Sequence, residues 1–195
     1  MTWDEFYKNI RDSNPLIWPD VQVVRLLSKL KLNDKVKVID LGCGEGRNIR
    51  LLCEKGFDVT ALDQSKHALN IVKTLYHLDD KQIICDNISS GIKTLNDNYY
   101  SLVLCWGLMH YITDTALVLK EIKRILKKGS SAILSFSTTR DKRDTADEVK
   151  CYFSQENIEE LLNGAGLKID DIGLIENHYI KQSKVESFYW ILASK

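Results

Sequence analysis

The sequence predicts an α/β domain with a doubly wound, mostly parallel sheet. An apolar run at 36–41 ends in a turn of alternating glycines, which can take backbone angles that a Cβ would forbid. These glycines are Gly42, Gly44 and Gly46. A helical apolar pattern follows directly over 48–55 and stops at another glycine. A strand, a glycine turn and a helix in this order form the first unit of such a sheet, whose ligands bind at the carboxyl ends of the strands.

Strand-like and helix-like segments continue to alternate after this first unit. Short apolar and β-branched runs predict four more strands, at 57–62, 82–85, 100–105 and 131–136. Apolar residues at helical spacing predict a helix over 114–128, with Lys127 and Lys128 in its last turn and Gly129 as its stop. This alternation favours parallel strands joined by crossover helices.

Composition and charge narrow the classes of function. The 195 residues are 44% hydrophobic and contain no linker or repeat, so one domain over 1–195 is expected. Basic and acidic residues number 27 each, which gives no long-range field for a polyanion, so no nucleic-acid partner is expected. The five cysteines show no CxxC pairing, and Asp4 and Glu5 stand where a signal peptide would be basic and then apolar. A cytoplasmic protein without membrane contact is therefore expected, since no apolar stretch approaches the roughly 18 residues of a span.

The spacing of the glycines indicates which ligand is bound. A dinucleotide fingerprint, GxGxxG, needs a third glycine where this chain has Arg47. The chain instead has an acid, Asp40, followed by GxGxG, and these seven residues resemble motif I of the class I S-adenosylmethionine-dependent methyltransferases. The resemblance extends over about residues 30–137, and it implies a Rossmann-like sheet of seven strands in the order 3-2-1-4-5-7-6, with the last strand antiparallel and helices on both faces.

The same resemblance implies how the rest of the chain is arranged. A helix at 152–166 would precede two closing antiparallel strands at 170–176 and 186–193. Within the single domain, residues 1–30 would form a helical lid and 31–137 the cofactor-binding core. Residues 138–195 would supply a substrate-side loop, the helix and the closing hairpin.

The family resemblance also implies a set of cofactor-binding residues for S-adenosyl-L-methionine and its product S-adenosyl-L-homocysteine, with no metal. The glycine turn would pass under the amino acid part of the cofactor, and Asp63 would accept both ribose hydroxyls. Asp86 would accept from the adenine amine while the next backbone amides donate to the ring. The full set is Asp40, Gly42, Cys43, Gly44, Gly46, Asp63, Gln64, Asp86, Asn87, Ile88, Cys105 and Trp106.

Several of these residues have simpler explanations. NAD enzymes carry an acid at the position of Asp63, which can also cap the helix that begins near Ser65. Asp86 can sit in an ordinary turn. We expect Asp40 to orient the glycine turn by accepting its amides, and not to touch the cofactor directly.

Candidates for catalysis and substrate binding lie near the end of the strand at 100–105 and at the two ends of the chain. His110 is the only side chain of that region that can act as a base near neutral pH, although a single histidine at the head of a loop is more often a solvated or packing residue. The substrate-binding candidates are Tyr7, Trp18, Tyr111, Arg140 and Arg143. Residues 1–20 would fold over the cofactor as a lid or fasten a helix to the sheet, and the charged loop 138–150 is also typical of a solvated loop.

The sequence thus predicts a methyltransferase that acts on a small molecule, with oxygen favoured over nitrogen as the acceptor atom because a histidine base is available. No Asn/Asp-Pro-Pro-aromatic motif of amine methylation follows the strand at 100–105. Two alternatives stay open: an NAD(P)-dependent oxidoreductase, and a non-catalytic module that binds the cofactor for regulation. The sequence leaves the oligomeric state undecided.

Overall fold

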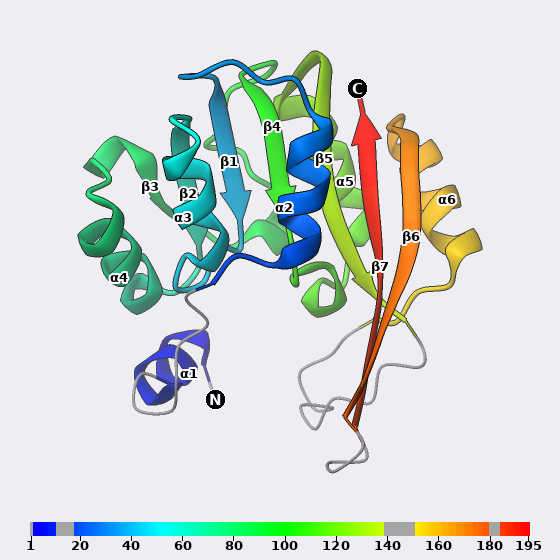
Figure 1. Cartoon of the computed structure of the whole chain (residues 1–195), viewed down its shortest axis with the longest axis horizontal. Coiled ribbons are helices and arrows are strands. Elements are labelled where there is room, and N and C mark those ends of the chain that lie inside the picture. Colours follow the sequence, from blue (N-terminus) through cyan, green and yellow to red (C-terminus); the bar gives the residue numbers. More distant parts are fainter. Residues whose placement is uncertain (1, 11–17, 139–150, 180–183) are drawn as a thin grey trace.

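The computed structural model of the chain describes residues 2–10, 18–138, 151–179 and 184–195. Its centre is one seven-stranded sheet in the order β3-β2-β1-β4-β5-β7-β6 (Figure 1). The strands are β1 (Lys37–Leu41), β2 (Asp58–Asp63), β3 (Ile83–Cys85), β4 (Tyr100–Cys105), β5 (Leu126–Ser137), β6 (Lys168–Tyr179) and β7 (Lys184–Ser194). The first five strands are parallel, and β7 runs antiparallel to both β5 and β6. The predicted fold class and strand order are confirmed.

Helices cover both faces of this sheet (Figure 1). They are α1 (Trp3–Ile10), α2 (Val21–Lys29), α3 (Arg47–Glu54), α4 (Lys66–Tyr76), α5 (Thr115–Ile125) and α6 (Gln155–Ala165). Three short 3-10 turns, η1 (Asp80–Gln82), η2 (Ile88–Ser90) and η3 (Met109–Tyr111), follow the α4 helix and the ends of β3 and β4. Among the described residues, no helix is both long and apolar enough to cross a bilayer.

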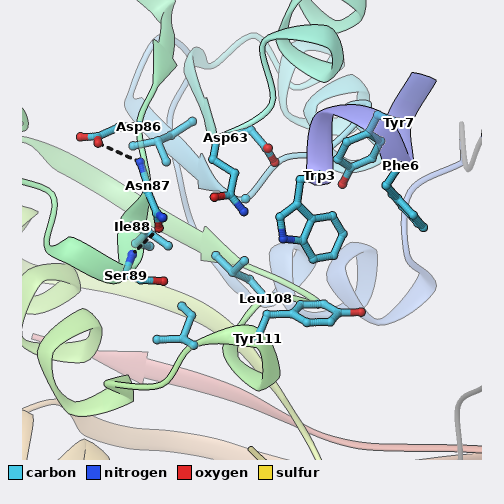
Figure 2. A pocket seen from close by; sticks show the side chains of 15 residues that line it. Trp3, Phe6, Tyr7, Asp63, Asp86, Asn87, Ile88, Ser89, Leu108 and Tyr111 are labelled. Atoms are coloured by element: carbon cyan, nitrogen blue, oxygen red, sulfur yellow. Dashed lines mark hydrogen bonds between the residues drawn. The ribbon is translucent and has the colours of Figure 1, made fainter. Parts of the chain in front are cut away.

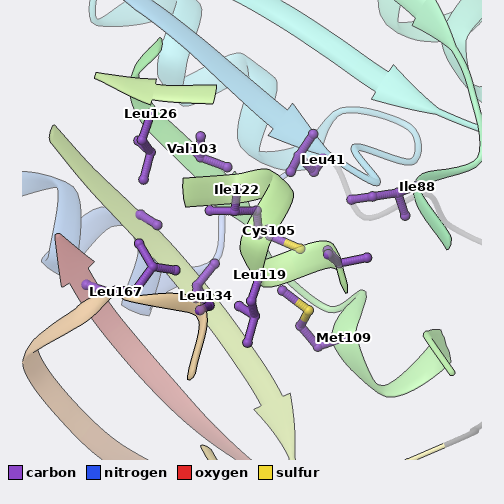
Figure 3. Packing of buried hydrophobic residues seen from close by; sticks show 14 of the residues in the cluster. Leu41, Ile88, Val103, Cys105, Met109, Leu119, Ile122, Leu126, Leu134 and Leu167 are labelled. Atoms are coloured by element: carbon purple, nitrogen blue, oxygen red, sulfur yellow. The ribbon is translucent and has the colours of Figure 1, made fainter. Parts of the chain in front are cut away.

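The central strand β4 divides the core into two halves. Its alternate residues point to opposite faces, as the period of two of a strand requires. Val103 and Cys105 pack with apolar residues of α5 and α6, such as Ile122 (Figure 3). Leu102 and Leu104 pack with residues from α2, α3 and α4 on the other face. Both halves are fully buried, so the sheet is a rigid platform for whatever lies at its ends.

Two boundaries differ from those predicted. The helix predicted over 114–128 ends at Ile125, because Leu126 is extended (φ −67°, ψ 138°) and pairs with Tyr100 in the sheet. Lys127 and Lys128 therefore lie in β5 and not in a last helical turn. Leu126 is completely buried, so its burial in the sheet outweighs the helical spacing that it shares with the residues before it. The two closing strands are also longer than predicted, and Figure 1 shows them extending well past the ends of β1 and β4.

Candidate active site

The glycine turn after β1 is held by strand β2. The amides of Gly42 and Cys43 both donate to the carbonyl of Leu62, at 2.8 and 3.0 Å, and the amide of Gly44 donates to the Asp63 carboxylate at 2.9 Å. All three glycines of the turn have positive φ, between 52° and 86°. The expectation that Asp40 accepts the amides of this turn is therefore wrong for these three, because groups of the neighbouring strand satisfy them.

Asp40 lies beneath the turn as a deeply buried carboxyl group. Its residue is 2% exposed, and burial raises its pKa well above the usual value. The nearby charge of Asp63 raises that pKa further, while Arg47 opposes the shift. Because the charge of Asp63 raises the pKa of Asp40, a cationic neighbour is favoured in the same region.

Asp63 ties the end of β2 to both of its neighbours. One carboxylate oxygen accepts from the amide of Gly44 and the other from the amide of Ser65, each at 2.9 Å. Ser65 is itself the N-cap of α4, since its hydroxyl accepts from the amide of Ala68. Burial raises the pKa of Asp63, and the amide hydrogen bonds partly counteract this. The carboxylate is therefore fixed in place before any ligand arrives.

The end of β3 forms the next part of the same edge. Asp86 accepts from the amide of Asn87 at 2.8 Å, and the Asn87 side chain accepts from the amide of Ser89 at 3.0 Å (Figure 2). The amide of Asp86 donates to the carbonyl of Asp63, so the two acidic strand ends are directly linked. These bonds shape a turn whose polar atoms border a cavity of about 230 Å³.

This cavity, called here the cofactor crevice, contains residues from four parts of the chain. Gly42, Asp63, Gln64 and the 86–89 turn line it from the sheet, and Gly107, Leu108, Tyr111 and Ile112 line it from the segment after β4. Trp3, Phe6 and Tyr7 close it from helix α1, on the side away from Asp86 in Figure 2. The described lining holds two acidic side chains and no basic one, so its electrostatics favour a cation.

Helix α1 is fixed over the crevice by polar and aromatic contacts. The Asp4 carboxylate accepts from the amide of His67 at 2.9 Å and from the hydroxyl of Ser65 at 3.0 Å. These bonds, led by the one from the His67 amide, lower the pKa of Asp4 to about 2. Trp3 packs edge-on against Tyr111, with ring centroids 4.9 Å apart. The expected N-terminal cover is thus formed by α1, whereas α2 packs on the sheet.

The three glycines have different surroundings. A Cβ on Gly42 would come within 2.8 Å of the Leu108 side chain, and one on Gly44 within 2.6 Å of the Tyr7 hydroxyl. Both residues therefore present bare backbone to groups that border the crevice. A Cβ on Gly46 would instead meet Val72 and Tyr76 of α4, at 2.9 and 2.7 Å, so this glycine serves helix packing.

The described residues at the N-terminus of α3 do not form a pyrophosphate-binding site in the crevice. The glycine that precedes it packs against α4, and Arg47 turns away from the crevice. The Arg47 guanidinium donates to the carbonyl of Trp18 at 3.2 Å and to Asp20 at 3.5 Å. A dinucleotide would need open backbone amides at this helix end, so the geometry argues against the NAD(P) alternative.

A second cavity, called here the β5–β7 cavity, lies beside the cofactor crevice and measures about 490 Å³. Ser135 and Ser137 of β5 and His110 of η3 are its buried polar residues, each at most 4% exposed. Ile175 and Phe188 border it from β6 and β7, and Trp106 follows β4. Glu186, Asp20 and Arg47 are its charged residues. Gly107 lines both cavities.

The predicted site residues divide between these two cavities. Gly42, Asp63, Gln64, Asp86, Asn87 and Ile88 line the cofactor crevice, together with Tyr7 and Tyr111, which were predicted for the substrate. His110 lines the β5–β7 cavity, and so does Trp106, which was predicted for the cofactor. Asp40, Cys43 and Gly44 lie in or beneath the glycine turn without lining either cavity.

Three groups of predicted residues need separate comment. Cys105 is completely buried in the core, and its thiol has a raised pKa because of that burial. Trp18 is 67% exposed, with its ring against the Arg50 guanidinium at 4.8 Å, and it lines neither cavity. Arg140 and Arg143 lie outside the described residues.

The sequence reasoning missed several lining residues. Trp3 and Phe6 lie within residues 1–20, which were predicted as a lid or a fastened helix, but nothing local indicates which of the aromatic rings there face inward. Ser135 and Ser137 alternate with apolar residues at the end of β5, which is a detectable signal of a strand face that turns polar where it leaves the core. Phe188 lies 51 residues further along the chain than Ser137, its partner in the β5–β7 ladder, and had no comparable signal.

Fold and site together define a Rossmann-like domain whose crevice suits a cationic ligand with ribose-like hydroxyls. Residues 39–134 match a family model described as "Methyltransferase domain". A Rickettsia bellii protein named ubiquinone biosynthesis O-methyltransferase is 26% identical over 161 residues, which span 73% of this chain and 66% of that protein. The chain thus spans just under two thirds of that relative's length.

Solved structures agree at the level of the fold. A SAM-dependent methyltransferase of Methanosarcina mazei superposes with a TM-score of 0.71 at 17% identity, covering 91% of this chain and 98% of that one. Phosphoethanolamine N-methyltransferase 2 of Haemonchus contortus, solved with S-adenosyl-L-methionine, gives a TM-score of 0.73 at 16% identity, over 100% of this chain and 60% of that one. The match over residues 39–134 and the shared fold together support a class I S-adenosylmethionine-dependent methyltransferase.

The residues of the crevice fit the cofactor of this family, S-adenosyl-L-methionine. Bare backbone at Gly42 and Gly44 leaves room that a Cβ would fill, and two acidic strand ends face a molecule that carries a sulfonium, a ribose and an adenine amine. Asp63 would hold the ribose, and the turn after Asp86 the adenine. Trp3, Tyr7 and Tyr111 add aromatic surface, which attracts cations.

Proposed function

We propose that this chain transfers a methyl group from S-adenosyl-L-methionine to a hydroxyl of a small molecule. The observation that carries the proposal is the pairing of Asp63 with the glycine turn, since its carboxylate accepts from the Gly44 amide at 2.9 Å while it lines an acidic crevice. One group thereby positions both the backbone cradle and the ribose site. A cofactor that spans both places needs them held in a fixed position relative to each other.

The protein residues have limited chemical work to do. The bound cofactor supplies an already activated methyl group, so the protein must align the acceptor, exclude water and remove one proton. His110 is our candidate for holding that proton, because its side chain is buried and lines the cavity next to the cofactor crevice. Helix α1, held by Asp4, would keep water out of the crevice.

Two observations support oxygen as the acceptor atom. A hydroxyl must lose a proton on methylation, and a histidine lines the cavity beside the crevice. The relative from Rickettsia bellii is named an O-methyltransferase. The β5–β7 cavity is concave, so it suits a small-molecule acceptor better than it suits the flat surface of a protein or nucleic acid.

The proposal is tested first by binding and then by transfer. Calorimetry with S-adenosyl-L-homocysteine and with NADH should show tight binding of the first and none of the second. The protein is then incubated with isotope-labelled S-adenosyl-L-methionine and a pool of hydroxylated and amine metabolites, and products are identified by mass. Labelled methyl ethers support the proposal, whereas labelled methyl esters or methylamines contradict the acceptor assignment.

The non-catalytic alternative predicts a different pair of results. A regulatory module would bind the cofactor in calorimetry and yield no labelled product from any pool. The Asp63→Ala variant is the control for both experiments, because it should lose cofactor binding and transfer together.

A further inference from the structure

We propose that the β5–β7 cavity is the acceptor site, that it selects an uncharged planar ring bearing a hydroxyl, and that Gly107 forms the opening through which the methyl group passes. The inference rests on the proposed function and names the substrate class of the same site. It follows from the way one short segment separates the two cavities.

The segment 106–111 after β4 forms the wall between the cavities. Leu108 and Tyr111 line the cofactor crevice, whereas Trp106 and His110 line the β5–β7 cavity. Successive side chains of the wall are thus divided between a cofactor side and an acceptor side. The proposed base, His110, stands on the acceptor side, where the proton would be released.

Gly107 is the one described residue of this wall that lines both cavities. Its φ is +74°, and a Cβ built on it would meet nothing within 4 Å. The amide of Gly107 donates to the Ser135 hydroxyl at 2.7 Å, which holds the backbone at the edge of the acceptor side. The absence of a side chain at this point leaves open space, so the wall has an opening where the cofactor and acceptor must meet.

Among the described residues, the buried polar groups that line the β5–β7 cavity are two hydroxyls and one imidazole. Ser135 and Ser137 are 4% and 1% exposed, and His110 is 2% exposed. The Ser135 hydroxyl accepts from Gly107, so its own proton is left to donate to a ligand. Hydroxyl and imidazole groups can bind and orient a ring hydroxyl without the cost of burying a charge.

In the part of the chain that the structure describes, the charged residues that line the same cavity are Glu186, Asp20 and Arg47, and the Arg47 guanidinium is already engaged. The Arg47 side chain is 31% exposed and that of Asp20 is 19% exposed, and the two approach each other at 3.5 Å. Arg47 also donates to the Trp18 carbonyl. A carboxylate or phosphate on the acceptor would have to compete with these partners, which weakens the case for an anionic substrate.

The walls of the cavity suit a flat ring. Trp106 and Phe188 meet edge to face, with centroids 5.6 Å apart, and Ile175 is paired with Phe188 across the β6–β7 ladder. Aromatic rings held in this geometry offer both an edge and a face to a third ring. An uncharged phenol would contact this surface and place its hydroxyl near the buried serines and the histidine.

The selectivity is tested with three single-ring probes: catechol, benzoate and benzylamine. Their binding to the protein saturated with S-adenosyl-L-homocysteine is measured by saturation-transfer NMR, which needs no turnover. Catechol should bind at least about tenfold more tightly than the anion or the cation, because burying an unmatched charge costs more than 1.4 kcal/mol. Equal or tighter binding of benzoate or benzylamine would overturn the proposed class.

The location is tested by substitutions on the paired strands β6 and β7. Ile175→Ala and Phe188→Ala should each weaken catechol binding several-fold. Leu174→Ala is the matched control, because Leu174 precedes Ile175 on β6, is 43% exposed and does not line the cavity. If catechol binds all three variants as it binds the unmodified protein, the cavity is not the acceptor site. Cofactor affinity, measured on the same samples, separates this failure from failure of the proposed function.

The opening is tested by Gly107→Asn, since asparagine tolerates a positive φ better than other side chains do. Both ligands should still bind, while methyl transfer to the acceptor identified above falls at least about tenfold because a side chain now fills the opening. Gly129→Asn is the control, with φ of +72° and equally open surroundings. An unchanged transfer rate in Gly107→Asn, or an equal fall in both variants, would refute the role of Gly107.

Discussion

The cofactor crevice and the β5–β7 cavity are built in different ways. The crevice depends on backbone groups of the glycine turn and on two acids at successive strand ends, all within 42–89, and is closed by α1. The β5–β7 cavity gathers side chains from positions as far apart as Asp20 and Phe188. A bound cofactor that needs bare backbone constrains a short continuous motif, whereas an acceptor that contacts side chains constrains scattered positions. The cofactor motif can therefore be recognised in the sequence, whereas single substitutions can change the acceptor cavity.

The largest expected effect tests the acceptor side of this comparison. His110→Gln should lower kcat by about 100- to 10 000-fold, the range that general-base catalysis contributes, with little change in affinity for S-adenosyl-L-homocysteine. The measurement is steady-state methyl transfer together with calorimetry. His178→Gln is the control, because the His178 side chain is 63% exposed on β6 and does not line the cavity.

A packing role for His110 predicts another outcome. The melting temperature would fall, and cofactor affinity and kcat would fall together. The pH dependence of kcat separates the two roles. The fall of kcat at acid pH in the unmodified protein should be absent from the variant only if His110 is the base.

The next largest effect tests the crevice. Asp63→Ala removes an acceptor of two backbone amides as well as the proposed ribose contact. At about 1.5 kcal/mol or more for each lost charge-assisted bond, affinity for S-adenosyl-L-homocysteine should fall by about 100-fold. Asp58→Ala on the same strand is the control, since its ion pair with Lys37 is part-exposed and contributes little. Equal affinities of the two variants would show that Asp63 does not hold the cofactor.

A smaller effect tests whether the backbone itself is required. Gly44→Ala places a methyl group 2.6 Å from the Tyr7 hydroxyl and strains a φ of +52°. Left-handed backbone costs roughly 1–2 kcal/mol for a residue with a Cβ, so the free turn should relax away from the conformation that the cofactor needs, and restoring that conformation on binding should lower affinity by about tenfold. Gly129→Ala has a comparable positive φ, +72°, with open space around it and lies away from the crevice, so it should leave affinity unchanged.

The contact with helix α1 can be separated from the backbone strain by a double substitution. Tyr7→Phe removes the hydroxyl that the new methyl group would meet, so it should recover part of the loss in Gly44→Ala. If Tyr7→Phe recovers nothing, the whole effect of Gly44→Ala lies in the turn, and α1 is not part of the cradle.

The sequence predicted the features that belong to a local backbone motif, and it did not predict those that depend on scattered side chains. The positions of Asp63 and Asp86 were predictable because each follows a local pattern at a strand end, whereas the strand order followed from the family resemblance. The partner of the glycine turn was not, because the Leu62 carbonyl competes with Asp40 only once β1 and β2 are paired. The face of β6 that points into the β5–β7 cavity could not be counted from the sequence either, since the register shifts between Ile169 and Asp171.

The smallest expected effect concerns pH, and it distinguishes Asp63, which lines the crevice, from Asp40, which lies buried beneath the glycine turn. Burial raises the pKa of Asp63 in the folded protein, so its protonated form persists to higher pH than in an exposed aspartate. The ribose contact needs the carboxylate as an acceptor, and binding must therefore release the remaining proton. Affinity for S-adenosyl-L-homocysteine should fall as the pH drops through this raised pKa, and the fall should begin at a higher pH than it would for an exposed aspartate.

Calorimetry in two buffers of different ionisation enthalpy measures the released proton directly. Asp63→Asn should abolish both the pH dependence and the proton release, because no carboxyl group remains at that position. Should the release persist in Asp63→Asn, the titrating group is Asp40, whose pKa burial also raises and which lies beneath the same turn. That result would move the electrostatic centre of the crevice from the ribose end to the glycine turn, because the carboxyl group responding to the cofactor would then be the one below the backbone cradle.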